Sequence, residues 1–247
     1  MIHNPYYAFF LKHNLTNTIE PKERPKTFAL NYGAIIEELK HKLTPKDTKE
    51  ISHLINNYSP YHAAIGVVHL IQYVLSKNYS WAIPTPEVLS SIAQNKNILN
   101  VSEDNGYWSY LLKQLGCNVL ALSTKKIRKS WFRISKPLDF LGKVKKYKDR
   151  TLLLIWPPYN TKAAYKTISA FVGEKILYVG EWLGGCGDTN FHNHLLTNFS
   201  LVQKPIQLLR LGLCRDYLFE FERKKRGSKL PNYALRRARN SYGKGCG

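Results

Sequence analysis

The chain has 247 residues, a formal net charge of +20 and a hydrophobic fraction of 44%, with aromatic residues at 13%. This apolar content is enough for a hydrophobic core, so the composition excludes an intrinsically disordered chain. No apolar run is long enough to form a transmembrane segment, and the 4 cysteines form no CxxC pair, which favours reduced thiols in an intracellular compartment over zinc or disulfides.

The positive charge is concentrated in two segments. Residues 124–150 hold eleven Lys or Arg against two Asp, and residues 221–247 hold nine against one Glu. A single run of lysines is usually a solvated surface, but two such segments favour binding to a polyanion, either nucleic acid or an acidic membrane.

The N-terminal part of the chain divides into an arm and a group of helices. Residues 1–30 are aromatic and then rich in Pro and Lys, which favours an extended N-terminal arm. Apolar spacing predicts helices from about 31 to 43 and from about 60 to 76, and Thr44, Pro45 and Asp47 form a helix start between them. We expect residues 31–80 to form a helical cap packed on a later sheet.

After Thr85 and Pro86, which begin another helix, strands and helices alternate. The strands are expected near 97–102, 118–123, 130–135, 151–156, 175–181, 200–207 and 213–222, and the helices near 106–116, 137–147, 160–172 and 188–198. This alternation predicts an α/β fold with a mostly parallel sheet of about seven strands and helices on both faces. The last two strands form an antiparallel pair at the sheet edge, and residues 224–247 form a basic tail.

Four sequence blocks in residues 81–223 resemble a known family. They are Trp81-x-Ile83-Pro84-x-x-Glu87, then Gly106-Tyr107-Trp108, then Leu152 to Tyr159 with the letters LLLIWPPY, then Tyr178 to Glu181. In this order they resemble the class I, Rossmann-like S-adenosylmethionine (SAM) dependent methyltransferases, closest to a group of methyltransferase-like proteins. The resemblance implies a Rossmann-like domain over residues 81–223. It also likens the WPPY block to the Asx-Pro-Pro-Tyr loop that amino-methyltransferases place beside the transferred methyl group.

The cofactor motif of that family is degenerate in this chain. The family holds SAM through glycines after its first strand and an acidic residue after its second. Here the first two motif glycines are replaced by Ser102 and Asp104, and Ser123 stands at the acidic position. Asn100 replaces the acid that commonly ends strand one. We therefore expect a vestigial site at Ser102, Asp104, Gly106, Tyr107 and Ser123, with no catalytic residue and no cofactor. If the chain is active, the resemblance assigns SAM as cofactor and Pro157, Pro158 and Tyr159 as the catalytic loop.

Several motifs keep a structural alternative. Tyr107 and Trp108 are either core aromatics or ligand contacts, and the WPPY block is either a rigid strand-ending turn or part of a site. The glycine-rich residues 180–188 lack the Gly-Lys-Ser/Thr of a phosphate loop and favour a flexible turn. His192 and His194 are two apart on an expected helix, so they face different ways and are poor metal ligands; no metal is expected.

These observations predict a non-catalytic methyltransferase-like protein that binds RNA, expected to be ribosomal RNA, as a structural component of a large ribonucleoprotein with other proteins. A mitochondrial ribosome suits this character, so the expected compartment is the mitochondrion and otherwise the cytoplasm. The alternatives are an active SAM-dependent methyltransferase acting on RNA or a ribonucleoprotein-associated protein, and a basic subunit of a membrane or protein assembly without RNA. The aromatic residues that lie among the basic ones are expected to stack on unpaired bases; they are Trp131, Phe132, Tyr147, Tyr233 and Tyr242, of which the last two lie in the basic tail. The expected RNA-binding residues are Lys125, Lys126, Arg128, Lys129, Arg133, Lys145, Lys146, Lys148, Arg223, Lys224, Lys225, Arg226, Arg236, Arg237 and Arg239.

Overall fold

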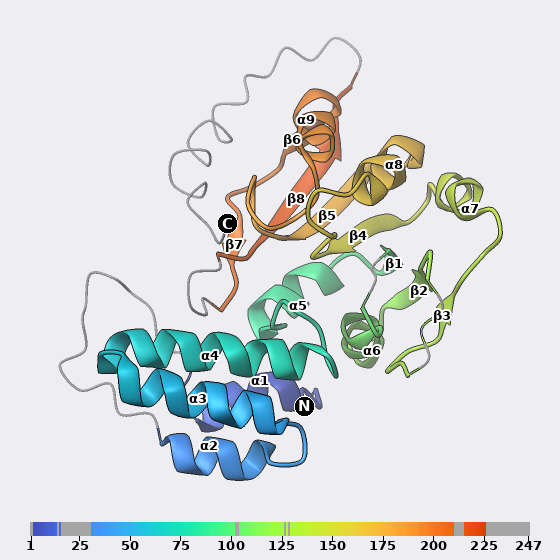
Figure 1. The fold of residues 1–247 in the computed structure, drawn as a ribbon. Coiled ribbons are helices and arrows are strands. Elements are labelled where there is room, and N and C mark those ends of the chain that lie inside the picture. The colour runs from blue at the N-terminus through green and yellow to red at the C-terminus, as the bar shows by residue number, and fades with distance from the viewer. Residues whose placement is uncertain are drawn as a thin grey trace.

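The computed structural model describes residues 2–13, 15, 31–101, 104–125, 127, 129–209 and 215–225 (Figure 1). They form one mixed sheet covered by helices, with a group of N-terminal helices packed beside it. In this part of the chain no helix has both the length and the apolar character of a membrane span.

The sheet has eight strands in the order β3-β2-β1-β4-β5-β8-β6, and β7 also pairs with β8. The strands are β1 (Asn97–Val101), β2 (Asn118–Leu122), β3 (Ile134–Ser135), β4 (Thr151–Ile155), β5 (Lys175–Gly180), β6 (Phe199–Leu201), β7 (Ile206–Gln207) and β8 (Tyr217–Arg223). Strands β1 to β5 are parallel, whereas β8 is antiparallel to β5, β6 and β7. This arrangement is consistent with a Rossmann-like methyltransferase fold, so the predicted fold class is confirmed.

Two expected strands differ from the sequence prediction. Of the strand expected at 130–135, only Ile134–Ser135 forms a strand, β3, because Trp131 and Phe132 pack against the turn at Gly106 instead. The strand expected at 200–207 is split into β6 and β7, which pair with opposite ends of β8. Pro205 lies between them, and proline has no N–H to donate to a sheet ladder.

The central strands are buried on both faces, as their continuous apolar sequences require. On one face Leu153 and Ile155 of β4 pack with α5 (Pro86–Ala93) and α6 (Tyr107–Gln114) in one hydrophobic cluster. On the other face Leu152 and Leu154 pack with α7 (Phe140–Lys146), α8 (Ala163–Ala170) and α9 (Thr189–Asn198) in a second cluster. The alternation of side chains along each strand produces these two cores.

The N-terminal helices are α1 (Pro5–Lys12), α2 (Tyr32–Leu39), α3 (Pro45–Asn57) and α4 (Pro60–Ser76). Thr44 and Asp47 form the capping box of α3, and the Thr85 side chain caps α5, as their sequences predict. Buried residues of all four helices belong to the same cluster as α5, α6 and one face of the sheet. The helices therefore share a hydrophobic core with the sheet.

The prediction of an extended arm over residues 1–30 is wrong for α1. The Asn4 side chain caps the helix by accepting a hydrogen bond from the Tyr7 N–H, and Pro5 occupies its first turn. Tyr6 and Phe10 are fully buried. Burial of these aromatic side chains removes a large apolar area from water, which explains why this segment packs as a helix. Residues 16–30 lie outside the described residues.

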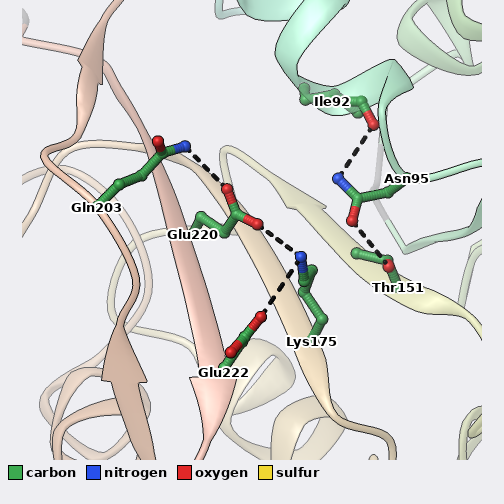
Figure 2. A network of polar contacts seen from close by, with 7 residues as sticks. All are labelled: Ile92, Asn95, Thr151, Lys175, Gln203, Glu220 and Glu222. Atoms are coloured by element: carbon green, nitrogen blue, oxygen red, sulfur yellow. Dashed lines mark hydrogen bonds and ion pairs between the residues drawn. The ribbon is translucent and has the colours of Figure 1, made fainter.

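A polar network ties strands and helices at the amino ends of the parallel strands (Figure 2). The Lys175 ammonium on β5 contacts Glu220 at 2.7 Å and Glu222 at 3.6 Å, both on β8. Partial burial lowers the Lys175 pKa, but the hydrogen bond and charge of Glu220 outweigh this, and the net pKa is raised. Nearby, Asn95 donates to the Ile92 carbonyl and accepts from the Thr151 hydroxyl, joining the end of α5 to the start of β4.

Candidate functional site

The turn after β1 is the place where a cofactor-binding glycine loop is expected. Gly106 has a left-handed backbone (φ +79°) and is the N-cap of α6. Asp104, which stands at a glycine position of the family motif, accepts a hydrogen bond from the Gly106 N–H at 2.8 Å. A short side chain thus supports the turn although the glycine is absent. Ser102 lies outside the described residues.

The connection between β2 and β3 packs directly against this turn. The Trp131 N–H donates to the Asn105 carbonyl at 2.9 Å. A Cβ atom on Gly106 would lie 3.1 Å from Cδ1 of Ile134 and 3.2 Å from Cβ of Phe132. The space in front of the glycine is therefore filled by the chain itself, and Gly106 is needed both for its positive φ and for this close packing.

Tyr107 and Trp108, which follow the glycine, are both fully buried. The Tyr107 hydroxyl donates to Asn4 Oδ1 at 2.9 Å, and burial raises its pKa. The Trp108 indole donates to Ser80 Oγ at 2.9 Å. Of the two alternatives left open for these residues, the structure favours the core role, because each polar group is used to join α6 to an N-terminal segment.

At the ends of β1 and β2 the structure has neutral polar residues where the family has acids. Ser123 is buried, and its hydroxyl accepts a hydrogen bond from the Lys125 N–H at 3.1 Å. Asn100 is also buried and donates to Ser109 Oγ at 2.8 Å on α6. Neither side chain supplies the carboxylate that would accept two hydrogen bonds from a ribose.

The described residues leave little room at this edge of the sheet. A cavity lined by Val101, Ser123, Leu154 and Pro157, among others, has a volume of about 30 Å³. Pockets for small molecules are typically roughly 300 Å³ or larger, whereas a space of this size suits a water molecule. This cavity is too small for SAM, and neither Asn100 nor Ser123 offers the carboxylate that anchors the ribose in the family that the sequence resembles.

The WPPY block forms a strained turn at the end of β4. Trp156 has a left-handed backbone (φ +43°), which is uncommon for a bulky residue. Its N–H donates to the Val179 carbonyl at 2.8 Å, and its indole donates to Asp216 Oδ1 at 2.8 Å. Asp216 precedes β8 and is buried, and this burial raises its pKa to about 7, with a further increase from the nearby Glu181 charge.

Two of the residues expected to act in an active enzyme, Pro157 and Pro158, line the same small cavity as Ser123. The Pro157 carbonyl accepts a hydrogen bond from the Gly187 N–H at 3.0 Å, and the Pro158 carbonyl accepts one from Thr161 Oγ1 at 3.1 Å. Tyr159 is 69% exposed. The two proline carbonyls of the block therefore already have partners within the fold, which favours the interpretation as a rigid strand-ending turn.

The glycine-rich loop after β5 is organised around a buried carboxylate. Glu181 accepts hydrogen bonds from the N–H groups of Gly185 and Arg215, each at 2.8 Å. A Cβ on Gly185 would lie 3.2 Å from this carboxylate and 3.2 Å from the Trp156 ring, so the loop needs glycine for close approach. The interpretation as a flexible turn is therefore replaced by that of a loop wrapped on Glu181.

Sequence reasoning missed that Glu181 and Asp216 lie near one another. Glu181 carried a signal, because it ends the Tyr178 to Glu181 block, but Asp216 carried none, since β8 brings it into place from far along the chain.

His192 is buried with Nε2 2.9 Å from the Cys186 carbonyl, which agrees with a structural role. Within the described ranges, no group of His, Cys, Asp or Glu could hold a metal ion.

Most of the described basic residues expected to bind RNA are exposed. They are Lys125, Lys129, Arg133, Lys145, Lys146, Lys148 and Lys225. All but Lys225 lie on α7 or on the segments around β2 and β3, at one end of the sheet (Figure 1). Lys126, Arg128, Arg226, Arg236, Arg237 and Arg239 lie outside the described residues.

Arg223 and Lys224 both have hydrogen-bond partners within the fold. The Arg223 guanidinium donates to the carbonyls of Phe171 and Gly173 at 2.7 and 2.9 Å and lies over the Phe199 ring. The Lys224 ammonium donates to carbonyls in the last turn of α9, including that of Leu196 at 2.6 Å. These donors stabilise the edge of the fold, and the prediction that the two side chains bind RNA stays a prediction.

Comparison with known proteins gives similarity at the level of overall structure. No protein-family profile and no curated protein matches the chain. Among solved structures, a mutant of MtNAS in complex with SAM has 11% identity and a TM-score of 0.42 over 89% of this chain and 90% of that one.

Two further solved structures are similar at a comparable level. A protein from Pyrococcus horikoshii, provisionally described as an RNA methyltransferase, has 10% identity and a TM-score of 0.35 over 75% of this chain and 100% of that one. A provisional methyltransferase complexed with SAH has 7% identity and a TM-score of 0.37 over 55% of this chain, which spans only 48% of that structure's chain. Similarity of this size carries no information on activity. The chain has a Rossmann-like fold of the methyltransferase type. This assignment of the fold class rests on the order of the strands in the sheet.

Gly106→Ala should destabilise the protein more than Gly116→Ala. Both glycines have φ +79°, but a Cβ on Gly116 meets nothing within 4 Å, whereas a Cβ on Gly106 meets Phe132 and Ile134. A left-handed alanine costs about 1–3 kcal/mol, and only Gly106→Ala must also displace packed side chains. Urea unfolding of the two variants measures the difference. Equal losses would show that the β2–β3 connection does not pack on the turn.

Asp216→Asn should change the pH dependence of stability. Because the folded pKa of Asp216 is about 7 and its usual value is 3.8, the folded state binds more protons between these values, and stability is lost as pH rises through this window. As the pH rises from 5 to 8, the free energy of unfolding of the variant should therefore increase by on the order of 2 kcal/mol relative to that of the unmodified protein. Urea unfolding at both pH values measures this gain, with the exposed Asp149→Asn as control. A gain no larger than that of the control contradicts the prediction.

Proposed function

We propose that this chain is a non-catalytic, methyltransferase-like protein that binds RNA as a structural component of a large ribonucleoprotein. The observation that carries the proposal is the packing of Phe132 and Ile134 on Gly106, which fills the position where the fold would hold a cofactor. Within this proposal the RNA is ribosomal RNA, the neighbours are other proteins of the particle, and a mitochondrial ribosome is the preferred assembly, with a cytoplasmic particle as the other setting.

The distribution of charge supports RNA as the partner. Five exposed cations around β3 and α7 have side chains that form no ion pair or hydrogen bond with another described residue; they are Lys129, Arg133, Lys145, Lys146 and Lys148. Side chains that stabilise the fold, such as Lys175 and Arg223, have partners instead. Binding of nucleic-acid phosphates to exposed cations on one side of a protein is favourable, because counterions are released from the nucleic acid.

An active SAM-dependent methyltransferase acting on RNA or an RNA-associated protein is the second candidate, and one observation favours it. Trp156 is strained and its indole is bonded to Asp216, a buried acid whose pKa is raised to about 7. Strained backbones and shifted pKa values cluster at functional sites. For SAM to bind, the Trp131 to Ile134 segment would have to leave the Gly106 turn.

Replacing Lys145, Lys146 and Lys148 together by Gln should weaken RNA binding and its dependence on salt. Each phosphate contact to single-stranded RNA contributes about 0.7 to the slope of log K against log salt, so losing three contacts lowers the slope by about 2. Filter binding to a labelled RNA over a range of salt concentrations measures it. The matched control replaces Lys42, Lys46 and Lys49, which are exposed on or before α3, and should bind nearly as the unmodified protein does. Equal losses in both variants would mean that net charge, and not this surface, determines binding.

Isothermal titration of the purified protein with SAM separates the two candidates. The packed turn and the missing carboxylate predict no binding heat at millimolar SAM. Binding with micromolar affinity that is abolished by Gly106→Trp would overturn the non-catalytic proposal in favour of the enzyme.

A further inference from the structure

Three aromatic rings form a stack that begins in the core and ends at the surface. Tyr6 and Tyr79 are stacked with centroids 4.8 Å apart and an interplanar angle of 12°, and Tyr79 and Trp131 are stacked at 5.6 Å and 25°. Tyr6 is fully buried, whereas Trp131 is 37% exposed. The stack therefore runs from a fully buried ring, Tyr6, to a ring that is partly exposed to solvent, Trp131.

The partly exposed ring of the stack, Trp131, is held in a fixed orientation. The Trp131 indole donates to the Asn78 carbonyl at 2.6 Å, and its backbone N–H donates to the Asn105 carbonyl. Tyr107 and Tyr110 of α6 contact the same ring, with centroids 5.1 and 5.3 Å away. A ring that is already ordered loses little conformational entropy when a ligand stacks on it.

We propose that Trp131 is a stacking platform for an unpaired RNA base, with Lys129 and Arg133 contacting the flanking phosphates. Both cations are exposed, lie two residues from Trp131 on either side, and have no ion-pair partner among the described residues. An exposed indole between two free cations has the chemistry of single-stranded RNA recognition, since a base supplies a flat face and its backbone supplies the negative charge. This inference rests on the proposed function and names where, and in which form, the RNA is bound.

The other described aromatics of this basic segment do not fit the role. Phe132 is half-buried and directs its Cβ toward the Gly106 turn. Tyr147 is half-buried, and the Arg150 guanidinium lies over its ring at 5.9 Å. Phe140 is also half-buried and packs against the hydrophobic cluster of the second sheet face. Each of these three rings already makes a contact within the fold and is half-buried, whereas Trp131 is the exposed ring of the segment.

The test compares two probes on the full-length protein: a fluorescein-labelled, single-stranded RNA of twelve nucleotides, and an abasic strand of the same length that keeps its phosphates. Stacking of one base is worth about tenfold in affinity, so the intact RNA should bind the unmodified protein about tenfold more tightly than the abasic strand. Trp131→Leu should remove this preference by weakening only the intact RNA. Trp131→Phe keeps a ring and should retain part of the preference.

Tyr58→Leu is the matched control, because Tyr58 is 53% exposed at the end of α3 and lies outside the basic segment. It should leave both affinities unchanged. Equal affinity of the unmodified protein for both probes, or an equal loss for both in Trp131→Leu, would overturn the platform while leaving RNA binding intact. Absence of binding to either probe at low salt would instead overturn the proposed function, and this inference with it. The probe comparison on the unmodified protein stands even if Trp131→Leu folds poorly.

Discussion

The aromatic stack of Tyr6, Tyr79 and Trp131 is the contact on which the carboxyl edge of the sheet depends. It joins three segments that are far apart in the chain: helix α1, the connection between α4 and α5, and the connection between β2 and β3. Because stacked and edge-to-face rings bury large apolar surfaces, this contact holds the β2–β3 connection against the Gly106 turn. The same packing that stabilises the N-terminal helices thus places Phe132 and Ile134 against Gly106.

Two opposite arrangements of charge follow from this fold. At the amino ends of the parallel strands Lys175 is paired with Glu220 and Glu222, and the pairing joins the antiparallel β8 to β5. Around β3 and α7, Lys129, Arg133, Lys145, Lys146 and Lys148 are exposed, and none of them forms an ion pair in the part of the chain that the structure describes. A protein selected only for stability gains little from a concentration of like charges, which destabilise the compact state through repulsion. The polyanionic partner that we propose would supply a physical reason for keeping them together.

The buried acids Glu181 and Asp216 show how the WPPY turn is maintained. Glu181 holds the glycine-rich loop and the backbone before β8, and Asp216 accepts the indole of the strained Trp156. Such a turn persists only when its surroundings determine its conformation strongly. These contacts favour a structural role for the block within the fold.

The sequence by itself determined the elements and the class of fold. Capping residues such as Thr44 and Thr85, and the apolar runs of β1, β4 and β5, are local signals that need no tertiary contact to be recognised. It also identified the degenerate cofactor motif, since replaced glycines are visible residue by residue. Tertiary structure alone decided that α1 is packed, that Asp216 meets Trp156, and that Arg223 is used within the fold. Each of these depends on contacts between residues distant in the chain, and neither spacing nor composition encodes which buried partner a side chain will meet.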